Sequence, residues 1–222
     1  MTDAASSSAS SPFQNVLTSE AALREFYREP SEVVQEKTIP YLDQTAKDFI
    51  AQSTFVMIGT SNGTQQNVSP KGGPAGFIKV IDDGHLAIPD LNGNNRLDGL
   101  RDITVHPHVG LVFVIPGMKE TLRVNGDACV SVDDDVLDLF TEEVRRPKSA
   151  IGVTVRTAFL HCGKAFLRGG IWTPDMWVSE SDQPSPGEML IAHAAIDGIS
   201  SDELDTSLAA SYDDDLAADQ PE

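Results

Sequence analysis

The sequence predicts a mainly β fold with flanking helices, and two observations support this. Six segments are rich in Val, Ile, Thr and Phe and are bounded by Gly, Pro, Asn and Asp, as strands are. These segments are residues 53–61, 76–82, 85–90, 109–117, 120–132 and 149–162. The joints at 82–84 and 116–119 are as short as hairpin turns. Short strands joined by hairpins favour an antiparallel sheet, which can close into a barrel and so remove its edges.

Helices are expected on both sides of the strand region. Residues 18–27 offer Thr18 or Ser19 as an N-cap, and residues 42–53 place apolar side chains at helical spacing. Shorter helical segments are expected at 95–105, at 134–142, and around Leu190 and Leu204. We therefore expect three parts: a disordered lead at 1–14, one domain at 15–175, and an acidic extension of loop and helix at 176–222.

Composition and charge exclude several classes of protein. The 222 residues carry a net charge of −18, and thirteen Asp and Glu but no Lys or Arg follow Arg168. A chain charged in this way should repel nucleic acid and anionic membranes. Cys129 and Cys162 form neither a disulfide framework nor a metal-ligand spacing. Because the sequence has no apolar run of membrane-spanning length and no signal-like start, a cytoplasmic location is expected.

Residues 90–105 predict a site for an anion. The stretch "DLNGNNRLDGL" brings asparagine amides and a guanidinium to the start of a predicted helix, where free N–H groups and the helix dipole favour a phosphate. The alternative is an ordinary capped helix behind a glycine-containing loop.

Two further stretches carry cations in this acidic chain. "NVSPKGGPAGF" (67–77) holds Ser69 and Lys71 among glycines that let a ligand approach the backbone, although a flexible loop with a solvated lysine fits as well. In "KETLRVNG" (119–126) Thr121 and Arg123 share one face of a predicted strand. His106 and His108 lack a third ligand, so no metal site is predicted.

Taken in order, five stretches resemble the pyridoxamine 5′-phosphate oxidase-like, FMN-binding split-barrel superfamily, and most of all its branch of FMN-dependent enzymes without an assigned substrate. They are "FIAQSTFVMIGTSN", "NVSPKGGPAGF", "LAIPDLNGNNRLDGLRDI", "HPHVGLVFVIPGMKETLRVNGDA" and "FLHCGKAFLRGGIW". The resemblance covers residues 40–172. It implies a six-stranded antiparallel split β-barrel that forms a homodimer, with FMN in grooves at the subunit interface.

The resemblance also implies cofactor-binding residues. Asn94, Asn95 and Arg96 would hold the FMN phosphate. The other candidates for contacts with the flavin are Val68, Ser69 and Lys71 on one strand, Thr121 and Arg123 on another, and Lys164, Arg168 and Trp172 after the last strand. The true oxidases carry an Arg-Lys pair where this chain has Asn95-Arg96, and their C-terminal substrate residues have no counterpart after Trp172. Oxidation of vitamin B6 is therefore not the expected reaction.

The resulting functional hypothesis is an FMN-dependent oxidoreductase that transfers a hydride through flavin N5 and acts on an unidentified small molecule. The catalytic residues are not predicted. The alternatives are a non-catalytic flavin carrier, the same barrel binding a deazaflavin or a haem with His161 or His85 as axial ligand, and a dimerisation module without a cofactor.

Overall fold

The computed structural model describes residues 12–221 and divides into two units, the first ending at Glu36 and the second beginning at Lys37. The first unit contains α1 (Glu20–Phe26) and α2 (Glu32–Glu36). The Ser19 side chain accepts a hydrogen bond from the Ala22 N–H at 3.2 Å, which confirms the helix and selects Ser19 as its N-cap. Most of the expected disordered lead, residues 1–11, lies outside the described residues.

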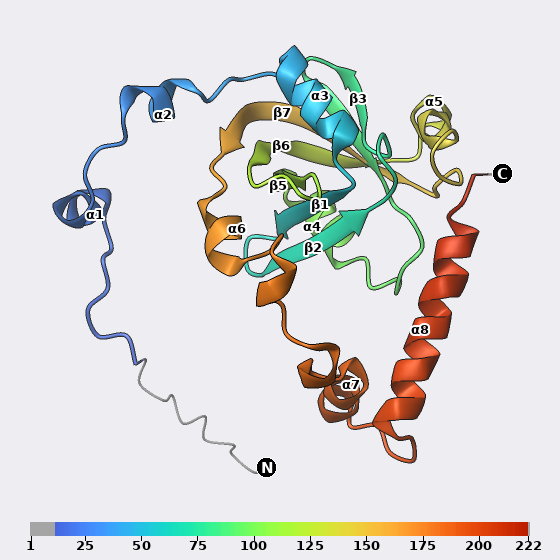
Figure 1. The fold of residues 1–222 in the computed structure, drawn as a ribbon. Coiled ribbons are helices and arrows are strands. Elements are labelled where there is room, and N and C mark those ends of the chain that lie inside the picture. Colours follow the sequence, from blue (N-terminus) through green and yellow to red (C-terminus); the bar gives the residue numbers. More distant parts are fainter. Residues whose placement is uncertain (1–11, 222) are drawn as a thin grey trace, which may run out of the picture. The chain divides into compact units, whose positions relative to one another are not determined.

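The second unit is built on one antiparallel sheet of seven strands (Figure 1). Their order across the sheet is β2-β1-β5-β6-β7-β4-β3. The strands are β1 (Phe55–Ser61), β2 (Gln66–Gly72), β3 (Lys79–Asp82), β4 (His85–Pro89), β5 (His108–Val114), β6 (Thr121–Ser131) and β7 (Ala150–His161). No hydrogen-bonded pairing joins β2 to β3 within residues 12–221, so these two strands end the sheet.

The seventh strand, β2, is the one that residue patterns did not predict. Its residues are polar, proline or glycine apart from Val68, which is the composition of a loop. It nevertheless pairs with β1 along its whole length, with Pro70 opposite Met57. A proline is tolerated there because β2 is an edge strand, whose outer N–H groups need no partner in the sheet.

The other predicted elements are found. The hairpins at 82–84 and 116–119 connect β3 to β4 and β5 to β6. The predicted helices correspond to α3 (Gln44–Gln52), α4 (Asp98–Val105), α5 (Asp134–Leu137) with the 3₁₀ turn η1 (Asp138–Phe140), α7 (Pro186–Ala194) and α8 (Ser201–Ala218). A further helix, α6 (Lys164–Gly169), follows β7, and the short turns η2 (Pro174–Met176) and η3 (Glu180–Asp182) precede α7. No helix among residues 12–221 is long and apolar enough to cross a membrane.

One face of the sheet carries the core. The alternation along β1, β5 and β6 buries Ile58, Leu111 and Val124 on that face. The predicted helical spacing at 42–53 is confirmed, because Leu42, Ala46, Phe49 and Ile50 are all buried. Helix α3 contacts β3 and β6, and α4 contacts β1, β2 and β6 (Figure 1).

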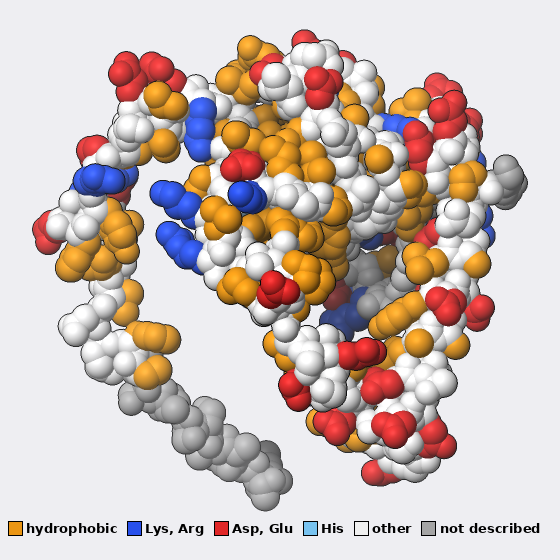
Figure 2. Space-filling view, in the orientation of Figure 1, with side chains coloured by type: hydrophobic (Ala, Val, Ile, Leu, Met, Phe, Trp, Pro, Cys, Tyr) orange, Lys and Arg blue, Asp and Glu red, His pale blue; other side chains and the backbone are white. Residues whose placement is uncertain are grey.

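The opposite face of the same strands is only partly covered. The register aligns Pro70, Met57 and Val112 across β2, β1 and β5, and Arg123 and Phe159 continue this row on β6 and β7. We call these five residues, together with Val68, the outer row. Met57 and Val68 are exposed, and Figure 2 shows hydrophobic side chains gathered over this part of the sheet.

Candidate functional site

The loop between β4 and α4, residues 90–97, has an unusual backbone. Asn95 and Leu97 have φ angles of 56° and 60°, in the left-handed region that asparagine tolerates and leucine rarely adopts. Between them, the Arg96 N–H donates to Asn94 Oδ1 at 3.0 Å. The helix starts at Asp98 rather than at residue 95, so Asn94, Asn95 and Arg96 lie in the loop before its first turn.

These left-handed residues turn neighbouring side chains to different sides. Asn95 lines a cavity of about 170 Å³ and Arg96 lines a second cavity of about 220 Å³. Both cavities are smaller than the roughly 300–1,000 Å³ of pockets that enclose a whole ligand. Two of the three predicted phosphate-binding side chains, those of Asn95 and Arg96, therefore do not converge on one point.

We call the second cavity the arginine cavity. It lies between the β1–β2 turn, β2 and α4, and two guanidinium groups and three side-chain amides line it. Its lining residues are Asn62, Gln65, Asn67, Arg96, Asp98, Arg101, Asp102 and Val105. The Arg96 Nε donates to Asp98 Oδ2 at 2.9 Å, and the Arg96 side chain is 73% exposed. Arg96 is therefore free to turn towards a ligand.

A buried carboxylate forms part of the wall of this cavity. Asp102 Oδ2 accepts hydrogen bonds from Asn67 Nδ2 at 2.7 Å and from Thr60 Oγ1 at 2.8 Å. The hydrogen bond from Asn67 holds the pKa of Asp102 below its ordinary value of 3.8, and those from Thr60 and Asn62 act in the same direction against burial. Asp102 is thus ionised at neutral pH and ties α4 to β1 and β2.

The predicted residues of β2 divide between the two faces of the sheet. Ser69 and Lys71 pair with Ile58 and Val56 and so lie on the core side, whereas Val68 points to the outer face. Lys71 Nζ is 2.7 Å from Asp90 Oδ1, with both side chains largely buried. A methyl group added at Gly99 in α4 would lie 3.9 Å from Ser69 Oγ. Lys71 is therefore close to Asp90, the first residue of the loop, and Ser69 is close to α4.

The remaining predicted residues form a separate group near the start of β6. Arg123 lies on the outer face with its guanidinium 5.1 Å from the centre of the Phe159 ring, and Thr121, which alternation puts on the same face, is buried. Trp172 Nε1 donates to the Met118 carbonyl at 2.7 Å, which fastens the segment after α6 to the β5–β6 turn. Lys164 and Arg168 are exposed on α6.

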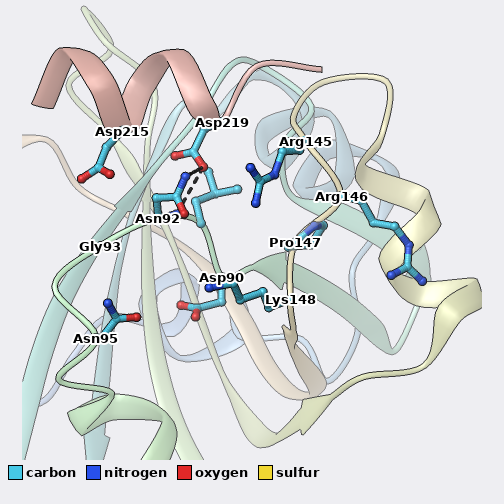
Figure 3. A pocket seen from close by; sticks show the side chains of 11 residues that line it. Asp90, Asn92, Gly93, Asn95, Arg145, Arg146, Pro147, Lys148, Asp215 and Asp219 are labelled. Carbon is cyan, nitrogen blue, oxygen red and sulfur yellow. Dashed lines mark hydrogen bonds between the residues drawn. The ribbon is translucent and has the colours of Figure 1, made fainter. Parts of the chain in front are cut away.

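The first cavity, which we call the tail cavity, brings together residues that sequence reasoning missed. Its walls are the loop 90–95, the segment 145–148 and the end of α8 (Figure 3). Its lining residues are Asp90, Leu91, Asn92, Gly93, Asn95, Arg145, Arg146, Pro147, Lys148, Asp215 and Asp219. The run "RRPK" was a visible signal, with three cations in four residues of an acidic chain.

Strand pairing explains why these distant segments meet. Pro89 at the end of β4 pairs with Ala150 at the start of β7, and the Asp90 N–H donates to the Ser149 carbonyl at 3.0 Å. The loop after β4 and the segment before β7 therefore leave the sheet side by side. No group of three or more His, Cys, Asp or Glu side chains that could hold a metal ion is present in the described part of the chain.

Comparison with known proteins identifies the family. Residues 42–162 match the family model described as pyridoxamine 5′-phosphate oxidase, and this match spans more than half of the chain. The chain belongs to the pyridoxamine 5′-phosphate oxidase family. A search of curated proteins finds no match.

Several solved structures are similar to part of this family member. HupZ of Group A Streptococcus is 19% identical, with 53% of this chain and 92% of that chain covered and a TM-score of 0.43. The General Stress Protein 26 of Bacillus anthracis is 15% identical, with coverages of 51% and 88% and a TM-score of 0.38. An FAD binding protein from Mycobacterium smegmatis is 13% identical, with coverages of 56% and 99% and a TM-score of 0.38.

The family match covers some of the predicted cofactor-binding residues and not others. The residues from Val68 to Arg123 lie inside the matched range of the pyridoxamine 5′-phosphate oxidase family, and so does the segment 145–148. Lys164, Arg168 and Trp172 lie beyond it, as do α7 and α8. The part of the tail cavity that α8 contributes is therefore outside the region that defines the family.

Proposed function

We propose that this family member is an FMN-binding flavoprotein and acts as an FMN-dependent oxidoreductase on a small molecule. The observation that carries the proposal is the arginine cavity. Arg96 and Arg101 line it together with the amides of Asn62, Gln65 and Asn67. Guanidinium groups bind phosphate through charge-assisted hydrogen bonds, and amides supply further donors.

The size and the charges of the arginine cavity fit a phosphate group. With about 220 Å³ it has room for the phosphate of FMN, and the rest of the molecule would lie outside it. Asp102 is already satisfied by two donors, so its charge is partly compensated. Asp98 is bonded to Arg96, and we propose that a phosphate replaces it as the partner of this guanidinium.

The ring system of the flavin would lie along β2, on the side of the strand that leads away from the phosphate. Asn67, Ser69 and Lys71 follow one another on one side of β2, and the first of them lines the arginine cavity. When bound, FMN supplies hydride acceptance and donation at N5. Lys71 would place a positive charge beside the ring system and Ser69 a hydroxyl group, while Asp90 holds the lysine in position.

We further propose a homodimer in which a second copy covers the outer row. Met57 and Val68 expose large apolar side chains there, and Leu167, Ile171, Met176 and Trp177 do so around α6 and η2. Exposed apolar surface of this extent is typical of protein–protein contacts. Thr121, Arg123, Lys164, Arg168 and Trp172 lie apart from the arginine cavity, so in this arrangement they would meet a flavin held by the other copy.

The absorption spectrum of the purified protein tests the proposal, first as isolated and then with added FMN. Bound flavin would make the protein yellow, and anaerobic mixing with NADH, NADPH or small donors should then bleach it. A yellow protein that no donor bleaches would be a flavin carrier. A protein that ignores FMN would contradict the proposal, and it would then be tested with a deazaflavin and with haem.

A further inference from the structure

The tail cavity contains cations that have no carboxylate partner. Arg145 is half-buried, and within residues 12–221 neither Arg145 nor Lys148 forms an ion pair. Figure 3 shows the Arg145 guanidinium turned towards Asn92 and Asp219, and Arg146 turned away from them. Arg146 also lines the cavity, but ion pairs with Asp134 and Asp138 hold its guanidinium away from Asn92 and Asp219. The cavity therefore offers Arg145 and Lys148 to an anion.

Amide groups on the opposite wall add hydrogen-bond donors. Asn92 and Asn95 line the cavity from the loop, and Gly93 between them leaves the backbone uncovered. A methyl group added at Gly93 would meet nothing within 4 Å, so the space beside this backbone is open. Guanidinium, ammonium and amide donors around a space of about 170 Å³ fit a phosphate or a carboxylate group.

The chain itself places carboxylates at this site. Asp219 Oδ1 accepts hydrogen bonds from the Asn92 N–H at 3.2 Å and from Asn92 Nδ2 at 2.9 Å. The Arg145 N–H donates to the Asp219 carbonyl at 2.8 Å. Asp215 lies one turn earlier on α8 and also lines the cavity. The Asp219 carboxylate therefore occupies donors that an external anion would use, and the Asp215 carboxylate adds negative charge at the wall of the cavity.

Helix α8 makes few contacts with the β-sheet. None of its residues is buried, and its main packing partner is α7. Asp205 of α8 accepts hydrogen bonds from Ser185 Oγ and from the Gly187 N–H at the start of α7. The C-terminal end of α8 carries the negative end of the helix dipole and three consecutive aspartates, 213–215, without any cation. Asp219, directly after the helix, meets the cavity through the hydrogen bonds that it accepts from Asn92 and from the Arg145 N–H.

We propose that the tail cavity binds the anionic group, a phosphate or a carboxylate, of a small molecule, and that Asp215 and Asp219 of α8 compete with this ligand. The acidic end of the chain would then act as a built-in competitor that the ligand displaces. The inference does not depend on FMN binding in the arginine cavity. If both hold, the ligand would lie beside Asp90, which connects the tail cavity to Lys71.

Calorimetric titration of the full chain with inorganic phosphate, and separately with acetate, tests this proposal at constant ionic strength. Asp215→Asn with Asp219→Asn should raise the affinity for the bound anion by about fivefold for each charge removed, as expected for unit charges about 4 Å apart in water. The matched control is Asp213→Asn with Asp214→Asn, which changes the same charge on α8 outside the cavity lining and should have a smaller effect. Comparison of the two anions shows which group the cavity prefers.

Arg145→Gln distinguishes phosphate binding in the tail cavity from the phosphate binding that we propose for the arginine cavity. The variant should abolish the binding component that the two aspartate substitutions strengthen, and circular dichroism melts would confirm that it folds. The proposal would be overturned by titrations that Arg145→Gln leaves unchanged, by aspartate variants without effect, or by a control pair that raises the affinity equally. Titrations with FMN and riboflavin show whether the anion is the phosphate of a flavin. If it is, FMN competes with inorganic phosphate for the tail cavity and riboflavin does not.

Discussion

Lys71 Nζ lies 2.7 Å from Asp90 Oδ1, and this largely buried ion pair joins β2 to the first residue of the loop that carries Asn94, Asn95 and Arg96. It connects the strand proposed to run along the flavin with the loop proposed to approach its phosphate. The pair therefore fixes the position of the Lys71 ammonium group on this side of β2.

Replacing either member should change the reduction potential of bound flavin in opposite directions. Lys71→Gln removes a positive charge that favours the reduced, anionic flavin, so the potential should fall by on the order of tens of millivolts. Asp90→Asn leaves Lys71 uncompensated and should raise the potential. Spectroelectrochemical titration of the flavin-loaded protein measures both shifts.

The matched control for this ion pair is Lys79→Gln. Lys79 lies on β3, at the other edge of the sheet, and forms a similarly buried ion pair with Glu143. The effect of Lys79→Gln on the potential should be negligible. If Lys71→Gln altered only the affinity for FMN and not the potential, Lys71 would belong to the phosphate instead of the ring.

The charge on Asp102 should stabilise the fold in a pH-dependent manner. Its pKa is held below 3.8 in the folded chain by hydrogen bonds, first that from Asn67. The ionised group therefore contributes stability above its unfolded pKa, and this contribution disappears as the pH falls through the lower, folded pKa. Asp102→Asn should lower the melting temperature at pH 7, and the difference from the wild type should shrink as the pH falls below 3.8, the ordinary pKa of the carboxyl.

Thermal melts of wild type and Asp102→Asn between pH 3 and 7 make this measurement. Asp48→Asn is the control, since Asp48 is an exposed carboxylate on α3 that accepts a hydrogen bond from Gln44. Equal destabilisation at every pH would show that Asp102 acts through its shape and not through its charge.

The outer row should be the contact surface of a dimer. Met57 is 41% exposed in the middle of this row, and Met57→Glu would place a charge in a covered apolar interface, which is strongly unfavourable. Light scattering should give twice the chain mass of 23.9 kDa for the wild type and the single mass for the variant. Ile81→Glu on β3, half-exposed at the far edge, should leave the mass unchanged, and a monomeric wild type would contradict the dimer.

Sequence reasoning predicted the parts of the fold whose residues pack in the sheet. β-branched and aromatic residues gave six of the seven strands, because those strands bury one face in the core. Strand β2 is mostly polar and contains Pro70 at an edge, so its composition was that of a loop, and only the family resemblance indicated a strand ending at Lys71.

The candidate site was predictable only in part, for a conformational reason. The run from Asn92 to Arg96 predicted an anion site. The left-handed backbone at Asn95 and Leu97, however, turns the Asn95 and Arg96 side chains into different cavities. Spacing along the chain contains no information about such a turn. The meeting of this loop with Arg145 likewise depends on the pairing of β4 with β7.

The proposed flavin site depends on the arginine cavity as the place where the phosphate of FMN binds. Arg96→Ala should weaken FMN binding by about 1.5–3 kcal/mol, the range for a hydrogen bond to a charged group, and should leave riboflavin binding unchanged because riboflavin has no phosphate. Arg28→Ala, an exposed arginine of the first unit, serves as the control. Fluorescence titration of the three proteins with both flavins is therefore the most direct test. We expect FMN to bind more tightly than riboflavin, and only Arg96→Ala to remove this preference; equal binding of both flavins to the wild type would contradict a phosphate site in the arginine cavity.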